Sequence, residues 1–218
     1  VRRLWFEIFN SVRLFADDPE KALEDHVNNL NRYSKFLNEN KFEKLLYKSD
    51  KGTDLEVGLP KGYIFAGAGD LNSDKEEFIA NMPSEEVFSA PRLDGVNGKV
   101  YSTMPLNYNG NLIEDFYLVF KDGLVVDYDA KAGKEYLKNI LETDEGAKRL
   151  GEVALVSYNT PISMRKVLFY NTLYDENASC HFALGKSYPT CIEGGEKLSL
   201  EELKKRGMND SLTHVDFM

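Results

Sequence analysis

Acidic and imidazole side chains occur inside strand-like apolar segments of this chain, and their charge restricts how the chain can fold. His214-Val215-Asp216-Phe217 alternates polar and apolar residues, so an extended conformation places His214 and Asp216 on one face. Glu152 begins an apolar segment that runs to Val156. A carboxylate inside a protein is tolerated only when an opposite charge neutralises it. If these acids are buried, the fold must bring cations to them.

Two other segments carry the same kinds of donor atom. Glu176 lies five residues before His181, and Glu86 follows a short polar turn and precedes apolar sequence. Taken singly, each residue has an ordinary explanation: the three glutamates as solvated acids at the ends of elements, and His181 as a hydrogen-bonded core histidine. Taken together, four acids balance the charge of two divalent cations, and two imidazoles complete a dinuclear donor set. The six candidate ligands are Glu86, Glu152, Glu176, His181, His214 and Asp216.

Such a donor set is typical of two-metal hydrolases. In these enzymes one carboxylate bridges the ions, a hydroxide sits between them, and the pair polarises the scissile carbonyl. Water bound to the metal is acidified towards neutral pH and serves as the nucleophile. The donor pattern by itself does not choose the substrate.

Composition excludes several classes of function. The net charge of −9, from 27 basic and 36 acidic residues, disfavours a nucleic-acid partner because an acidic surface repels phosphate. No apolar stretch approaches the roughly 20 residues that cross a bilayer. The only cysteines, Cys180 and Cys191, do not make a disulfide framework, which indicates a reducing, cytoplasmic location.

The pattern of secondary structure predicts an α+β fold, with a mixed or antiparallel sheet and surrounding helices. Residues 17–40 have apolar side chains at helical spacing after a cap at Asp17 or Asp18. Asp122-Gly123 predicts a hairpin, and Ser199 with Glu202 predicts a capping box that opens a helix. Helices and strands mix without a βαβ rhythm, which argues against a doubly wound sheet. We further expect strands at 42–48, 54–59, 100–106, 112–120, 124–128 and 151–156, a tight loop at 62–69 and a helix over 130–149.

Four segments resemble one family closely and in the same order. They are residues 81–91 (NMPSEEVFSAP), 150–156 (LGEVALV), 168–185 (LFYNTLYDENASCHFALG) and 212–218 (LTHVDFM). The chain resembles the aminopeptidase T / aminopeptidase S family of thermophilic dinuclear metallo-aminopeptidases. Weaker likeness through residues 52–60 and 122–150 extends the resemblance over nearly the whole chain.

The resemblance implies an enzyme that releases N-terminal amino acids from peptides with two divalent ions, Zn²⁺, Co²⁺ or Mg²⁺. It implies the six ligands named above, with Glu152 as the bridging one, and a tyrosine at the active site, which is Tyr188 here. It also implies a homodimer. Family members are about twice as long, so we expect residues 1–218 to be the C-terminal catalytic domain, without the N-terminal α/β domain and the extreme C-terminal tail.

Two alternative functions remain at this stage. A metal-stabilised binding or interaction module would keep the ligands without turnover. A metal-free glycosidase would use Glu86 and Glu152 as its acid/base pair, but this leaves the His214 and Asp216 pattern unexplained. His26, the remaining histidine, is expected to be a surface or packing residue of its helix rather than a ligand.

Overall fold

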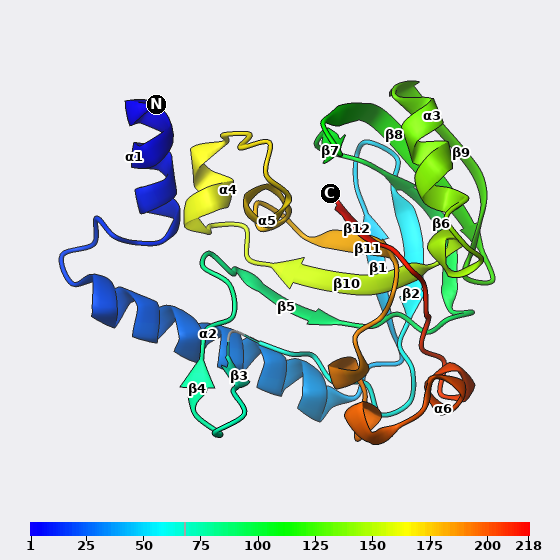
Figure 1. The fold of residues 1–218 in the computed structure, drawn as a ribbon, viewed down its shortest axis with the longest axis horizontal. Helices are drawn as coiled ribbons and strands as arrows, with labels where there is room; N and C mark the ends of the chain where they lie inside the picture. Colours follow the sequence, from blue (N-terminus) through cyan, green and yellow to red (C-terminus); the bar gives the residue numbers. More distant parts are fainter. Residues whose placement is uncertain (68) are drawn as a thin grey trace.

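The strands of the chain form antiparallel sheets with helices around them (Figure 1), as seen in a computed structural model that describes residues 1–67 and 69–218. The larger sheet has six strands in the order β1-β2-β6-β8-β7, and β9 also pairs with β8. Its strands are β1 (Lys44–Lys48), β2 (Asp54–Gly58), β6 (Val96–Tyr101), β7 (Leu106–Tyr108), β8 (Asn111–Lys121) and β9 (Leu124–Ala132). The predicted α+β class with antiparallel pairing is confirmed.

A second sheet has four strands in the order β12-β11-β10-β5, and each neighbouring pair is antiparallel. Its strands are β5 (Glu86–Ser89), β10 (Leu150–Val156), β11 (His181–Gly185) and β12 (His214–Phe217). A short two-stranded ribbon, β3 (Asp70–Leu71) with β4 (Glu77–Phe78), lies apart from both. The four-stranded sheet brings together all the segments that carry histidine and acid donors except the one that ends at Glu176.

Local signals in the sequence explain where two of the helices begin. Asp18 caps α2 (Pro19–Asn40) by accepting a hydrogen bond from the Lys21 amide, as predicted. Ser199 and Glu202 form the predicted capping box of α6 (Leu200–Lys205). The other helices are α1 (Arg2–Ser11), α3 (Lys134–Leu141), α4 (Pro161–Arg165) and α5 (Thr172–Glu176), with 3-10 turns η1 (Gly146–Lys148), η2 (Pro189–Cys191) and η3 (Gly195–Lys197). None of the helices in the described residues is long and apolar enough to cross a bilayer.

The helix expected over 130–149 is much shorter than predicted. Strand β9 continues to Ala132, and α3 ends at Leu141. Gly133 separates the two elements because it adopts a left-handed conformation (φ 73°), in which an added Cβ would lie 2.3 Å from the Leu112 carbonyl oxygen. The segment expected to be one strand at 100–106 instead contains the end of β6 and the start of β7.

The predicted Asp122-Gly123 hairpin is confirmed between β8 and β9.

The loop expected at 62–69 lies partly outside the described residues, because it includes Ala68. Within it, Tyr63 bridges to Ile192 and Ala66 to Phe88, so this segment lies beside the end of β5.

Aromatic side chains join the two larger sheets into one core. Phe217 of β12 packs on Phe116 of β8 and on Phe182 of β11, with ring centroids 5.6 and 5.8 Å apart. Phe182 in turn packs edge-on against Tyr47 of β1 at 4.9 Å. One face of the four-stranded sheet is thereby buried against the larger sheet, and its opposite face is left for other side chains.

A bulge in β10 sets the orientation of Glu152. The β10–β11 register shifts between Leu150 and Glu152, and Gly151 occupies the irregular position. A Cβ on Gly151 would lie 2.3 Å from the carbonyl oxygens of both Gly185 and Lys186. Only glycine therefore lets the two strands approach this closely.

We predict that Gly151→Ala lowers the free energy of unfolding by on the order of 1–3 kcal/mol or more, because backbone rather than a flexible side chain must move. Gly69→Ala is the control, since its nearest neighbour, the Phe78 carbonyl oxygen, would lie 3.9 Å from the new Cβ. Urea unfolding of both variants measures the difference. Equal stabilities would show that the close approach at Gly151 is not required.

Candidate metal centre

Strand alternation places the candidate ligands of the four-stranded sheet on its free face. Each apolar neighbour, Val87, Val153, Phe182, Val215 or Phe217, belongs to the hydrophobic core. The intervening residues, Glu86, Glu152, His181, His214 and Asp216, point the other way. Asp216 pairs with Ala183, which pairs with Glu152, so a methyl group lies between the two acids across the sheet. The small side chain adds little bulk between the donors.

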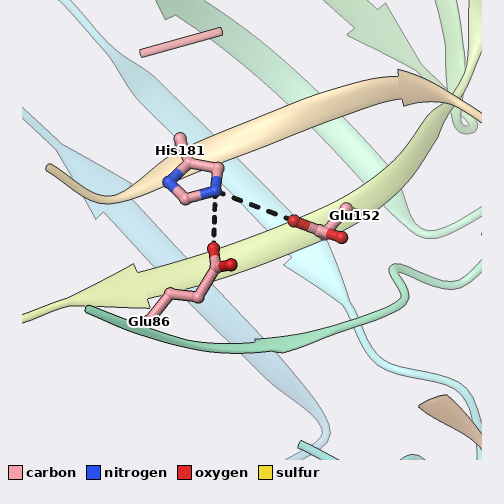
Figure 2. A group of neighbouring side chains, drawn as sticks. All are labelled: Glu86, Glu152 and His181. Carbon is pink, nitrogen blue, oxygen red and sulfur yellow. Dashed lines mark ion pairs between the residues drawn. The ribbon is translucent and has the colours of Figure 1, made fainter. Parts of the chain in front are cut away.

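The first group of donors joins three strands, as Figure 2 shows. His181 of β11 lies with its Nε2 atom 2.8 Å from Glu86 Oε2 and 3.7 Å from Glu152 Oε1. Glu86 comes from β5 and Glu152 from β10, and His181 is only 1% exposed. One donor atom from each of the three residues lies within 4.8 Å of the others.

The second group of donors shares Glu152 with the first. His214 Nε2 lies 3.7 Å from Glu152 Oε2 and 3.4 Å from Asp216 Oδ1. The two oxygens of one carboxylate therefore face two different histidines. This is the arrangement required of a carboxylate that bridges two cations.

Backbone carbonyls fix which ring nitrogen of each histidine faces the carboxylates. The Nδ1 atom of His181 lies 3.1 Å from the Ser179 oxygen, and the Nδ1 atom of His214 lies 2.8 Å from the Lys186 oxygen. Because a carbonyl only accepts, both Nδ1 atoms carry the proton, and in the neutral ring Nε2 has the free lone pair. Once the Nε2 protons are lost, both lone pairs face the carboxylate oxygens, an arrangement that a cation in place of the protons would stabilise.

The charges of the cluster shift the pKa values of its members. Burial alone would lower the pKa of His214, but the Asp216 and Glu152 carboxylates outweigh it and raise the pKa to about 9. The pKa of His181 is raised by Glu152 and Glu86 against the same opposing effect of burial. Burial also raises the pKa of Glu152, and the negative charges of Glu86 and Asp216 add to this effect.

Glu176 is the one candidate ligand outside both donor groups. It ends α5, and burial raises its pKa to about 9, with the charges of Asp216, Glu86 and Glu152 adding to the effect. The negative charges of the cluster thus act on the Glu176 carboxyl group, although no oxygen of Glu176 belongs to either close group of donors.

Tyr188 borders the cluster from the loop that follows β11. Its ring lies 4.9 Å from the ring of His214, between centroids, and 6.2 Å from that of Phe88. Burial raises the pKa of Tyr188 to about 12, and the charges of Glu152, Asp216 and Glu176 act in the same direction. The phenol therefore keeps its proton at neutral pH and can donate a hydrogen bond.

Two buried atoms of the first group point to a missing partner. Within the part of the chain that the structure describes, Glu86 Oε2 and His181 Nε2 are buried without a hydrogen bond of acceptable geometry, despite their short separation. Buried polar atoms are rarely left unpaired, and such exceptions often mark an ion or water. Imidazole nitrogen with carboxylate oxygen is a donor set suited to divalent transition metals such as Zn²⁺. The residues present thus fit a metal centre.

A buried cluster behind Glu86 was not predicted from the sequence. Glu85 is 2% exposed and receives both hydrogen bonds of the Arg13 guanidinium, at 2.7 and 2.8 Å. His26 joins this cluster through Arg13 and the Ser84 carbonyl, and it belongs to neither group of metal donors found among the described residues. His26 is thus a packing residue, as expected, but a hydrogen-bonded one. Adjacent acids such as Glu85 and Glu86 were the only signal in the sequence.

Comparisons with known proteins identify relatives that match along the whole chain. Aminopeptidase AmpS from Bacillus subtilis (strain 168) is 51% identical over all 218 residues, and aminopeptidase T from Thermus aquaticus is 42% identical over the same length. In both cases the match covers 53% of the relative. The solved structure of wild-type AmpT from Thermus thermophilus superposes on the whole chain with a TM-score of 0.91 at 41% identity, and 52% of that chain is covered. The chain thus spans about half the length of these relatives.

The model of the thermophilic metalloprotease family (M29) matches residues 1–218, the full length of the chain. Together with the relatives, the matching fold and the donor chemistry of the four-stranded sheet, this match shows that the chain belongs to the thermophilic metalloprotease family M29.

Proposed function

We propose that the chain holds the active site of a metal-dependent aminopeptidase with two divalent ions. The observation that carries this proposal is the position of Glu152, whose two oxygens face His181 and His214 separately. The names of the relatives, which are aminopeptidases, support the reaction class. Peptides are the proposed substrates.

The donor groups suggest how the ligands divide between two ions. Glu86 and His181 would hold one ion, His214 and Asp216 the other, and Glu152 would bridge them. Glu176, which is coupled to the cluster electrostatically, would complete the set after losing its proton. When bound, such a pair of ions supplies an acidified water and polarises the scissile carbonyl.

The protein's own groups would position the substrate around this centre. The protonated Tyr188 phenol borders the cluster and would donate a hydrogen bond to the oxygen that becomes negative in the transition state. The dense negative charge of the carboxylates would attract the free ammonium group of a peptide and so place the first peptide bond at the centre. This would make the enzyme act at N-termini without a side-chain pocket. A homodimer and a cytoplasmic location remain predictions from the sequence.

A binding module without turnover is the alternative that experiment must separate. A metal-free glycosidase pair is less consistent with the structure, because His181 Nε2 lies 2.8 Å from Glu86 and His214 Nε2 lies within 3.7 Å of Glu152. An acid/base pair needs neither histidine.

Hydrolysis of leucine-p-nitroanilide by the intact protein tests the proposal. We expect a chelator to abolish the activity and Co²⁺ or Zn²⁺ to restore it. Mutation of a residue that only supports a metal ligand typically lowers activity by about 10–100-fold. Glu152→Gln should lower activity by more than this, because it removes a negative charge that both ions would share. Metal content by mass spectrometry should fall for both ions together. Metal binding with no hydrolysis would favour the binding module.

Tyr188→Phe isolates the role of the phenol. Loss of a transition-state hydrogen bond lowers kcat by about 100- to 1,000-fold, while the metal content should stay at the wild-type value because the ring is retained. Tyr158→Phe, at an exposed tyrosine (82%), is the control and should retain full activity. A fully active Tyr188→Phe variant would remove Tyr188 from the mechanism.

Metal binding is predicted to depend on pH and to release protons. In the metal-free protein His214 and Glu176 both have pKa values raised to about 9, so both carry a proton at pH 7. A metal must displace these protons, and the affinity should therefore increase as the pH rises from 6 towards about 9. Calorimetry in two buffers with different heats of protonation counts the released protons. A flat affinity over this pH range with no proton release would contradict the proposed ligands.

A further inference from the structure

Glu85 and Glu86 are neighbours in the chain, but their side chains have opposite surroundings. Glu86 points to the candidate metal ligands, whereas Glu85 points to the loop between α1 and α2 and is 2% exposed. Successive residues of extended backbone face opposite sides, so one acid is available to a metal and the other to the helices. The position of Glu85 therefore affects the position of Glu86 directly.

The carboxylate of Glu85 is held at both oxygens by one charged side chain. Arg13 Nη1 and Nη2 donate to its two oxygens at 2.7 and 2.8 Å, a bidentate ion pair that fixes both distance and orientation. His26 lies behind this pair, with Nε2 2.7 Å from the Ser84 oxygen and Nδ1 3.0 Å from Arg13 Nη2. Because the carbonyl can only accept, Nε2 donates to it and Nδ1 accepts from Arg13.

The backbone of Glu85 is held by a different residue, Asn177. The Glu85 amide donates to Asn177 Oδ1 at 2.6 Å, and Asn177 Nδ2 donates to the Leu173 oxygen at 2.9 Å. Asn177 is fully buried and directly follows Glu176, another candidate ligand. One side-chain amide thus connects the segments that carry Glu86 and Glu176, although Asn177 lies 92 residues after Glu85 in the sequence.

Strand β5 requires such support because of its place in the fold. It is an edge strand of the four-stranded sheet, and its pairing with β10 begins at Glu86 opposite Val156. The end of an edge strand opens most readily. A metal ligand, however, must be held to within about 0.5 Å of its productive position. The pairing of β5 with β10 therefore holds Glu86 and the residues after it, but it does not hold the residues before Glu86.

We propose that Arg13, Glu85 and Asn177 are positioning residues, which hold Glu86 and Glu176 in place for metal binding. This inference rests on the proposed function, in which those two acids are metal ligands. Groups that orient the ligands of a metal typically contribute about 10–100-fold to its affinity. Arg13, in the loop between α1 and α2, would then act at the metal centre without touching it.

The chain offers matched controls for both kinds of contact. Glu7 of α1 has a buried carboxylate that forms another bidentate ion pair, with the partly exposed Arg165, at 2.6 and 2.9 Å, and Glu7 belongs to neither group of metal donors. Asn38 uses its amide as Asn177 does, since Oδ1 accepts from the Phe65 amide and Nδ2 donates to the Phe65 oxygen. Glu7→Gln and Asn38→Ala thus remove the same interactions as Glu85→Gln and Asn177→Ala.

The test measures the affinity of the intact protein for Zn²⁺ by competition with a chromophoric chelator, and the thermal unfolding of the metal-free protein. All four variants should unfold at lower temperature. Glu85→Gln and Asn177→Ala should in addition bind Zn²⁺ about 10–100-fold more weakly, whereas the controls should bind it as the wild type does. If Glu85→Gln does not fold, Arg13→Lys serves as the second variant. It keeps the positive charge but loses the bidentate hydrogen bonds, and it should likewise weaken the binding of Zn²⁺.

Two results would overturn the inference in distinguishable ways. Wild-type affinity in the Glu85, Asn177 and Arg13 variants, or equal losses in the controls, would remove the positioning role and leave the metal centre intact. A wild-type protein that binds no Zn²⁺, Co²⁺ or Mg²⁺ would instead overturn the proposed centre, and the positioning role with it.

Discussion

The accumulation of negative charge on one face of a small sheet is the constraint on which the structure depends. Glu86, Glu152 and Asp216 lie on strands of the same four-stranded sheet, and Glu176 is coupled to them from α5. Burial penalises each charge, and mutual repulsion adds to the penalty. Two histidines respond by holding their protons more tightly, but they offset only part of the charge. The fold therefore keeps an excess of negative charge at this face, which divalent cations are suited to neutralise.

The packing of the opposite face makes this deficit tolerable. Phe182 and Phe217 alternate with His181 and Asp216, and they bury the sheet against the larger one. Apolar burial on one face thus opposes the cost of the charges on the other. The same alternation explains why core and site cannot be shifted independently, since a slip of one residue in register would exchange them. Stability and donor geometry are consequences of one pairing pattern.

The sequence predicts those parts of the structure that depend on near neighbours. Asp18, Ser199 with Glu202, and Asp122-Gly123 mark a helix start, a capping box and a hairpin, and all three are confirmed. The helix predicted over 130–149 is longer than the observed one, because helical periodicity does not reveal the left-handed Gly133, which lies close against Leu112. Of the candidate ligands, all except Glu176 fall into the two close groups. The bulge at Gly151 and the Arg13–Glu85 pair could not be predicted, because they depend on partners far away in the chain.

The methyl group of Ala183, between Asp216 and Glu152 in neighbouring strands, has an implication for how such a centre evolves. The distance between donors across the sheet is set by backbone hydrogen bonds, which are common to every sequence that adopts this pairing. The chemical identity of each donor is set by a single side chain. Exchange of one donor can therefore alter which ion is preferred while the scaffold is inherited unchanged. A bulkier residue at the alanine position would instead place side-chain atoms between Glu152 and Asp216.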